Sequence, residues 1–172
     1  LKKSNPPSEK IDTETGATVQ RMLAEIQAGG EEVVRRYARD FDGWSGDVVL
    51  GEAAFTKAER SLSAGVKDDI RYARDRVCGF AQLQRDSLHE FESELRPGLV
   101  AGQKLIPVGT AGCYVPGGRY AHAASAVMSV GTAKVAGVKR IIACAPPFRG
   151  GPHAAIVAAG VILGLFLEAG EE

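Results

Sequence analysis

Residues 112–120 read Gly-Cys-Tyr-Val-Pro-Gly-Gly-Arg-Tyr, and this stretch decides the fold of the chain. The apolar run over 111–115 predicts a short strand, which enters the turn Pro116-Gly117-Gly118 and leads into a helix predicted over 122–136. A strand, a glycine turn and a helix in this order are typical of an α/β sheet.

The turn after the predicted strand is also the candidate binding site. In open α/β sheets, ligands bind at the carboxyl ends of the strands, where glycines let the backbone approach a ligand and the next helix offers free N–H groups to an anion. Tyr114 ends the strand and can lay its ring against an adenine, while Pro116 stiffens the turn. The spacing alone leaves a second interpretation open, a loop that only connects two elements, because the G-x-G-x-x-G fingerprint is absent.

The segments around this turn extend the α/β pattern. Strands are predicted over 99–106 and 140–145, and a further helix over 153–163. Strands that alternate with helices at short spacing favour βαβ units and a parallel sheet covered by helices. The predicted fold class is therefore α/β, with an incomplete Rossmann-like parallel sheet.

The first half of the chain has a different character, because it is polar and its apolar residues recur at helical spacing. Helices are predicted over 15–28 and 31–39, separated by Gly29-Gly30, then from about residue 53, and over 66–88. We therefore divide the chain into a helical N-terminal part, residues 1–97, and a partial Rossmann-like nucleotide-binding domain, residues 98–172.

The composition excludes several classes of protein. The 172 residues include 21 basic and 21 acidic ones, without the basic surplus of a nucleic-acid binder or of a polybasic membrane anchor. The longest apolar stretch, 154–167, is too short to span a bilayer, and no signal peptide opens the chain. Its cysteines (Cys78, Cys113 and Cys144) are widely spaced and predict reduced thiols. These features favour a cytoplasmic protein that binds neither nucleic acid nor a membrane.

Residues 112–120, followed by the run from Ser125 to Pro147, resemble the histidinol dehydrogenase family. The stretch Arg96-Pro-Gly-Leu-Val-Ala-Gly-Gln-Lys104 narrows the resemblance to the branch that oxidises sulfonated diols such as 3-sulfopropanediol, and Phe41-Asp-Gly43 is similar to a turn of the family. The likeness covers residues 13–159. It implies the aldehyde-dehydrogenase-like architecture of this family and an NAD-dependent, zinc-containing homodimer that oxidises an alcohol.

The resemblance also implies roles for particular residues. Tyr114 matches the family's tyrosine that contacts NAD, and Pro116 matches its neighbour in the motif. The family's catalytic Glu-His pair and zinc ligands lie further along the chain, and no segment here matches them. We therefore predict an N-terminal fragment or truncated product with no catalytic and no metal-binding residue, inactive alone. The alternatives are a non-catalytic nucleotide-binding or interaction module and a decayed gene product.

Other candidate residues form no recognisable pattern. The histidines His89, His122 and His153 are scattered, without a metal-binding spacing. A zinc site from Cys113, Cys144 and two histidines is conceivable, but both cysteines lie in apolar strands and are expected to be small core residues. Arg119, beside the glycines, can bind a phosphate or a sulfonate through a bidentate contact, and a solvated loop arginine is the equal alternative.

Overall fold

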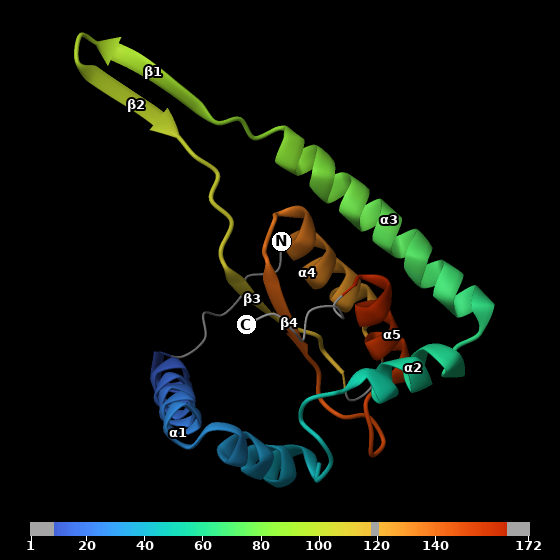
Figure 1. Ribbon diagram of the computed structural model, residues 1–172. Helices are drawn as coiled ribbons and strands as arrows, with labels where there is room; N and C mark the ends of the chain where they lie inside the picture. The colour runs from blue at the N-terminus through green and yellow to red at the C-terminus, as the bar shows by residue number, and fades with distance from the viewer. Residues whose placement is uncertain (1–8, 118–120, 165–172) are drawn as a thin grey trace, which may run out of the picture. The chain divides into compact units, whose positions relative to one another are not determined.

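The computed structural model describes residues 9–117 and 121–164 (Figure 1). By its internal contacts the chain divides into two units, Leu1–Val49 and Leu50–Glu172. The division into 1–97 and 98–172, based on composition, stays a prediction about domains; its boundary falls within a turn of the second unit.

The first unit contains α1 (Glu9–Asp42), which is two helical segments joined by a kink. Gly30 takes φ +57° and ψ −141° there, a conformation that glycine adopts without steric cost. The kink therefore falls where Gly29-Gly30 was predicted to separate two helices. Glu25, before the kink, accepts hydrogen bonds from Arg36 and from the hydroxyl of Tyr37 (2.8 Å for the latter), both after it. These bonds, Tyr37 first, hold the pKa of Glu25 below its usual range.

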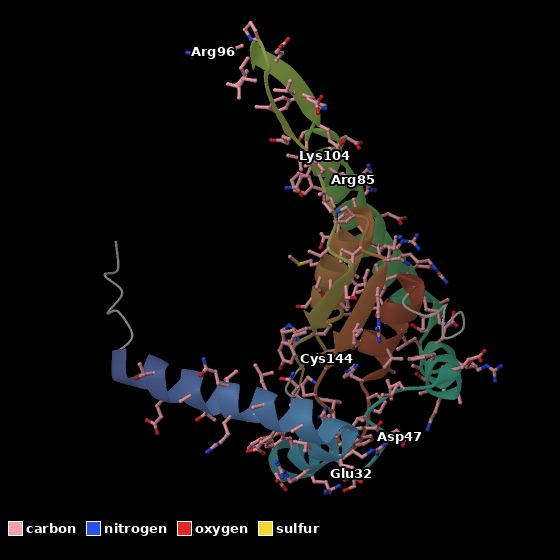
Figure 2. The ribbon with its side chains drawn as sticks, turned by 60° about the vertical axis from the view of Figure 1, so that its left-hand side comes forward. Glu32, Asp47, Arg85, Arg96, Lys104 and Cys144 are labelled. Carbon is pink, nitrogen blue, oxygen red and sulfur yellow. The ribbon has the colours of Figure 1, made fainter. Side chains whose placement is uncertain are left out.

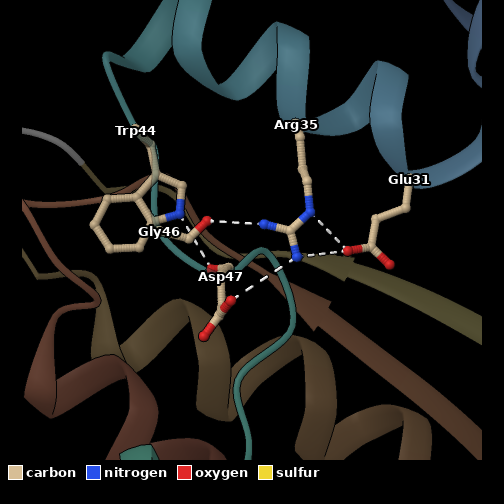
Figure 3. A network of polar contacts seen from close by, with 5 residues as sticks. All are labelled: Glu31, Arg35, Trp44, Gly46 and Asp47. Atoms are coloured by element: carbon tan, nitrogen blue, oxygen red, sulfur yellow. Dashed lines mark hydrogen bonds and ion pairs between the residues drawn. The ribbon is translucent and has the colours of Figure 1, made fainter.

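The loop that follows α1 is fastened to the helix by Arg35 (Figure 3). Its guanidinium donates from Nε to Glu31 Oε1 at 2.8 Å and from Nη1 to the carbonyl oxygen of Gly46 at 3.4 Å, and Nη2 lies 3.8 Å from Asp47 Oδ1. The indole N–H of Trp44 donates to the carbonyl oxygen of Asp47 at 3.1 Å, which closes a bond within the loop itself.

The second unit contains the βαβ element that the sequence predicts. Strands β3 (Thr110–Tyr114) and β4 (Arg140–Cys144) pair in parallel and are connected by helix α4 (Ala123–Val135). The other helices of this unit are α2 (Glu52–Ser61), α3 (Ala64–Asp86) and α5 (Ala154–Ile162). The α/β fold class is therefore confirmed, with a sheet of two strands in the described part of the chain.

The core lies between one face of this sheet and the helices. Cys113 and Val115 are buried on that face, and α4 contributes Val127 and Val130, which are 1% and 0% exposed. Helix α5 adds Ala159, also fully buried. Helix α3 starts at a Ser63 cap, whose Oγ accepts from the N–H of Val66 at 3.3 Å, and packs on α4.

One predicted strand pairs with a different partner from the one expected. The strand predicted over 99–106 is β2 (Leu99–Gln103), and it pairs antiparallel with β1 (Phe91–Arg96) instead of joining the parallel sheet. Pro97 and Gly98 form the turn, where Gly98 takes φ +79°. Gly102 lets the strands approach, since a Cβ there would lie 2.3 Å from the carbonyl oxygen of Phe91. The described strands therefore form two separate sheets, β1-β2 and β3-β4.

Candidate functional site

The candidate site lies at the carboxyl end of β3 and β4. The register pairs Tyr114 with Cys144 and Gly112 with Ile142, so that these four residues share one face of the sheet. That face is exposed: Tyr114 keeps 65% and Ile142 50% of its surface accessible. A Cβ built on Gly112 meets nothing within 4 Å, so there is open space beside the tyrosine. The exposed ring of Tyr114 is therefore available to a flat ligand such as an adenine.

Two loops border this end of the sheet. The loop after β3 contains Pro116, which is half-buried, and Gly117, where a Cβ would lie 3.1 Å from Pro146 Cγ in the loop after β4. The two loops therefore pack closely against each other. Of the motif's last residues, Gly118, Arg119 and Tyr120 lie outside the described residues, so the predicted anion contact of Arg119 stays a prediction.

The loop after β4 was not singled out from the sequence. Phe148 and Gly151 exchange two backbone hydrogen bonds of 2.7 and 3.1 Å, which close a tight turn that carries Arg149 at φ +48°. The guanidinium carbon of Arg149 lies 5.0 Å from the ring centre of Phe148, and His153 packs on the same ring at 4.8 Å between centroids. The sequence feature that could have predicted this turn is the dipeptide Arg149-Gly150, because glycine adopts a positive φ without steric cost.

The cysteines and histidines are not gathered at one place. Cys113 is buried, as expected for a small core residue, but the same expectation for Cys144 was wrong, because Cys144, which Figure 2 labels, is exposed. His153 caps α5, its Nδ1 accepting from the N–H of Ala155 at 3.2 Å. Within 9–117 and 121–164, no group of three or more His, Cys, Asp or Glu side chains is placed to hold a metal ion.

No helix among the described residues is both long enough and apolar enough to cross a membrane.

Comparison with known protein families gives one clear match. The profile of the family described as histidinol dehydrogenase matches residues 5–166. A protein of Ruegeria pomeroyi named histidinol dehydrogenase homolog is 48% identical over 160 residues, which cover 92% of this chain and 36% of that protein. A sulfopropanediol 3-dehydrogenase of the same organism is 47% identical over 165 residues, 95% of this chain and 38% of its own length.

More distant relatives agree with these matches. A histidinol dehydrogenase of Methanothermobacter thermautotrophicus is 35% identical over 144 residues, 82% of this chain and 33% of that protein. The crystal structure of a histidinol dehydrogenase from Elizabethkingia anophelis superposes with a TM-score of 0.79 at 20% identity, covering 96% of this chain and 36% of that one. The chain thus spans only about a third of the length of the relatives it matches.

Proposed function

The chain belongs to the histidinol dehydrogenase family, and we propose that it is the N-terminal portion of an NAD-dependent, zinc-containing alcohol dehydrogenase of that family. In this proposal the chain supplies part of the binding site for the adenine half of NAD and is inactive alone. The intact protein is a cytoplasmic homodimer. The observation that carries the proposal is the family's Tyr-Val-Pro-Gly-Gly motif, which stands at the carboxyl end of a parallel strand with its tyrosine exposed.

The residues present fit the cofactor but not the metal. Tyr114 offers an exposed aromatic face, and Pro116 follows in the loop, so these two residues would contact the adenine half of NAD. When bound, NAD supplies the redox chemistry by accepting a hydride from the alcohol. The described residues supply no ligand set for zinc, so the proposal assigns zinc and the proton-accepting groups to the part of the family that this chain does not cover.

The proposed substrate is a sulfonated diol such as 3-sulfopropanediol, with histidinol as the alternative. The sequence identities favour the sulfonated diol over histidinol, because the chain is 47% identical to the sulfopropanediol 3-dehydrogenase and 35% identical to the histidinol dehydrogenase of M. thermautotrophicus. A chimera tests it, in which this chain replaces the matching segment of the sulfopropanediol 3-dehydrogenase of R. pomeroyi. We expect the chimera to form NADH with 3-sulfopropanediol and to prefer it to histidinol. A folded chimera that binds no NAD would contradict the proposal.

Tyr114→Ala is expected to weaken NAD binding by the chain. A stacked aromatic contributes about 0.5–1.5 kcal/mol beyond its buried area, which corresponds to a loss of about threefold to tenfold in affinity. Calorimetric titration measures the affinity, and a melting curve reports the folded fraction. Tyr72→Ala is the matched control, since Tyr72 lies on α3 with a similar exposure of 63%. Equal affinity in the wild type and Tyr114→Ala, or a larger loss in Tyr72→Ala, would remove Tyr114 from the site.

A second candidate function is a nucleotide-binding or interaction module without catalysis. The uncovered sheet face with Tyr114 and Ile142 favours it, because an exposed apolar face of a sheet is a surface for a ligand or a partner. A chimera that fails to oxidise any alcohol, together with Tyr114-dependent NAD binding by the chain itself, would favour this module over the dehydrogenase.

A further inference from the structure

The loop between β4 and α5, residues 145–153, begins at the same edge of the parallel sheet as the candidate site. Strands β3 and β4 end together, since Tyr114 pairs with Cys144, and this loop starts at the next residue. In Figure 1 it runs on beyond the end of β4 before the chain turns back into α5. It packs on the loop after β3 through Pro146 and Gly117. The loop therefore lies at the edge where parallel sheets bind their ligands.

The turn within this loop holds Arg149 in a rare backbone conformation. Arg149 is the one residue other than glycine with a positive φ in the described part of the chain, at +48°. The two backbone hydrogen bonds between Phe148 and Gly151 keep the turn closed around it. A non-glycine residue in this region is strained, and such residues gather at ligand-binding sites. The turn thus presents a long cationic side chain at a position where glycine would cost less strain.

Aromatic contacts hold the side chain of Arg149 in place. Its guanidinium carbon lies 5.0 Å from the ring centre of Phe148, a cation–π contact. The imidazole of His153 packs on the same ring, at 4.8 Å between centroids. Because His153 Nδ1 accepts from the N–H of Ala155, the proton of the neutral imidazole is on Nε2, which is then a donor. One phenyl ring therefore contacts two side chains that can donate hydrogen bonds to an anion.

The charge of this part of the chain favours an anionic ligand. No aspartate or glutamate occurs from residue 95 to residue 167, and all but three of the chain's 21 acidic residues lie before this stretch. From β3 to Gly164 the chain carries only basic charges, namely Arg119, Lys134, Lys139, Arg140 and Arg149. Charges of one sign concentrate ligands of the opposite sign. A guanidinium binds the oxygens of a phosphate or a sulfonate through paired N–H donors.

We propose that the loop between β4 and α5 is a binding subsite for a tetrahedral oxyanion, in which Arg149 is the anchoring cation and His153 a second donor. Within the proposed dehydrogenase, two ligands carry such a group, the phosphates of NAD and the sulfonate of the substrate. The phosphates are favoured, because a nucleotide whose adenine contacts Tyr114 has its phosphates at the same edge of the sheet. The proposal rests on the proposed function for the choice between these two ligands.

Calorimetric titration of the full chain with ADP and with adenosine tests the subsite, because the two probes differ only in the phosphates. Arg149→Gly removes the guanidinium while the backbone keeps its positive φ without strain. We expect it to weaken ADP binding by about tenfold or more, the usual effect of losing a hydrogen bond between charged groups. Adenosine binding is expected to stay unchanged. Arg149→Lys keeps the charge without the paired donors and is expected to recover part of the affinity.

Arg140→Gln is the matched control, since it removes the same charge at the other end of β4. Melting curves of all variants show that each one is folded. A wild-type chain that binds ADP no better than adenosine, and does not bind 3-sulfopropanediol, would overturn the proposal. The same conclusion would follow if Arg140→Gln weakened ADP binding as much as Arg149→Gly.

Two further comparisons separate the possible ligands and the two proposals. Binding of 3-sulfopropanediol that depends on Arg149, with ADP and adenosine bound alike, would assign the subsite to the sulfonate. If Tyr114→Ala weakens adenosine binding while Arg149→Gly leaves both anions unaffected, the subsite is wrong and the proposed adenine site stands. If ADP binding depends on Arg149 and not on Tyr114, the subsite stands and the proposed adenine site is wrong.

Discussion

The isolated 172-residue chain is expected to form no NADH from 3-sulfopropanediol or from histidinol, with or without added zinc. Oxidation of an alcohol by this family's chemistry requires a base that accepts the hydroxyl proton and a group that holds the alcohol against the nicotinamide. The described residues contain no metal-binding group, and the chain covers about a third of its relatives. Contacts to the adenine half of NAD alone do not hold the alcohol or the nicotinamide in place. We therefore expect no catalysis above the uncatalysed rate.

Absorbance at the NADH band, followed against a blank without protein, measures this outcome. The chimera with the R. pomeroyi enzyme is the positive control, because it contains the same 172 residues within a complete chain. Alcohol-dependent NADH formation by the isolated chain, sustained over many turnovers, would show that a catalytic group was overlooked. Elemental analysis of the same sample after dialysis checks the metal, and stoichiometric zinc that depends on Cys113 would point to the rejected cysteine–histidine site.

Val130→Asp is expected to abolish the cooperative folding of the second unit. Val130 is 0% exposed in the core between α4 and its neighbours, and among the described residues no polar or charged side chain is buried that could pair with a carboxylate. Burial without a partner raises the pKa of a carboxyl by about 3–5 units, so near neutral pH the aspartate must take up a proton to fold. From an unfolded pKa of about 3.9 and at 1.36 kcal/mol per unit, this costs up to about 4 kcal/mol, and the loss of the packed valine adds to it. A domain of this size has only about 5–15 kcal/mol of stability in total.

Thermal unfolding followed by circular dichroism measures the effect, and the control lies on the same helix. Met128 is 59% exposed, so Met128→Asp adds the same charge to α4 in contact with water, and we expect a change within about 0.5 kcal/mol, as at other surface positions. Equal melting temperatures for Val130→Asp and the wild type would show that α4 is not packed as described.

The sequence predicted the βαβ element because its signals are local. The apolar runs over 111–115 and 140–145 are each bounded by glycine or proline, and a helical stretch of small apolar residues lies between them. Strands β3 and β4 and helix α4 were therefore located, and the family motif placed Tyr114 at a strand end. The binding roles of Tyr114 and Pro116 come from the resemblance and stay predictions.

The features that were missed depend on contacts across the chain. Strand β1 was counted in the helical half, although Phe91, Ser93 and Leu95 alternate with charged residues, because a short exposed strand is defined by its partner and not by burial. Cys144 was expected in the core because an apolar strand of a parallel sheet is usually covered on both faces. Here four of the five residues of β4 are exposed, Cys144 among them, and only Ile141 is half-buried.

The three cysteines thus lie at three depths, with Cys144 exposed, Cys78 half-buried and Cys113 buried. The rate at which a thiol-specific reagent modifies each cysteine depends on how often its sulfur is exposed to solvent. Cys144 can react in the native state, whereas Cys113 reacts only after the sheet has separated from the helices that cover it. Cys144 is the register partner of Tyr114, so a ligand or partner bound on that face of the sheet would slow its labelling. A single labelling time course therefore reports on the exposed face through Cys144 and on the core through Cys113.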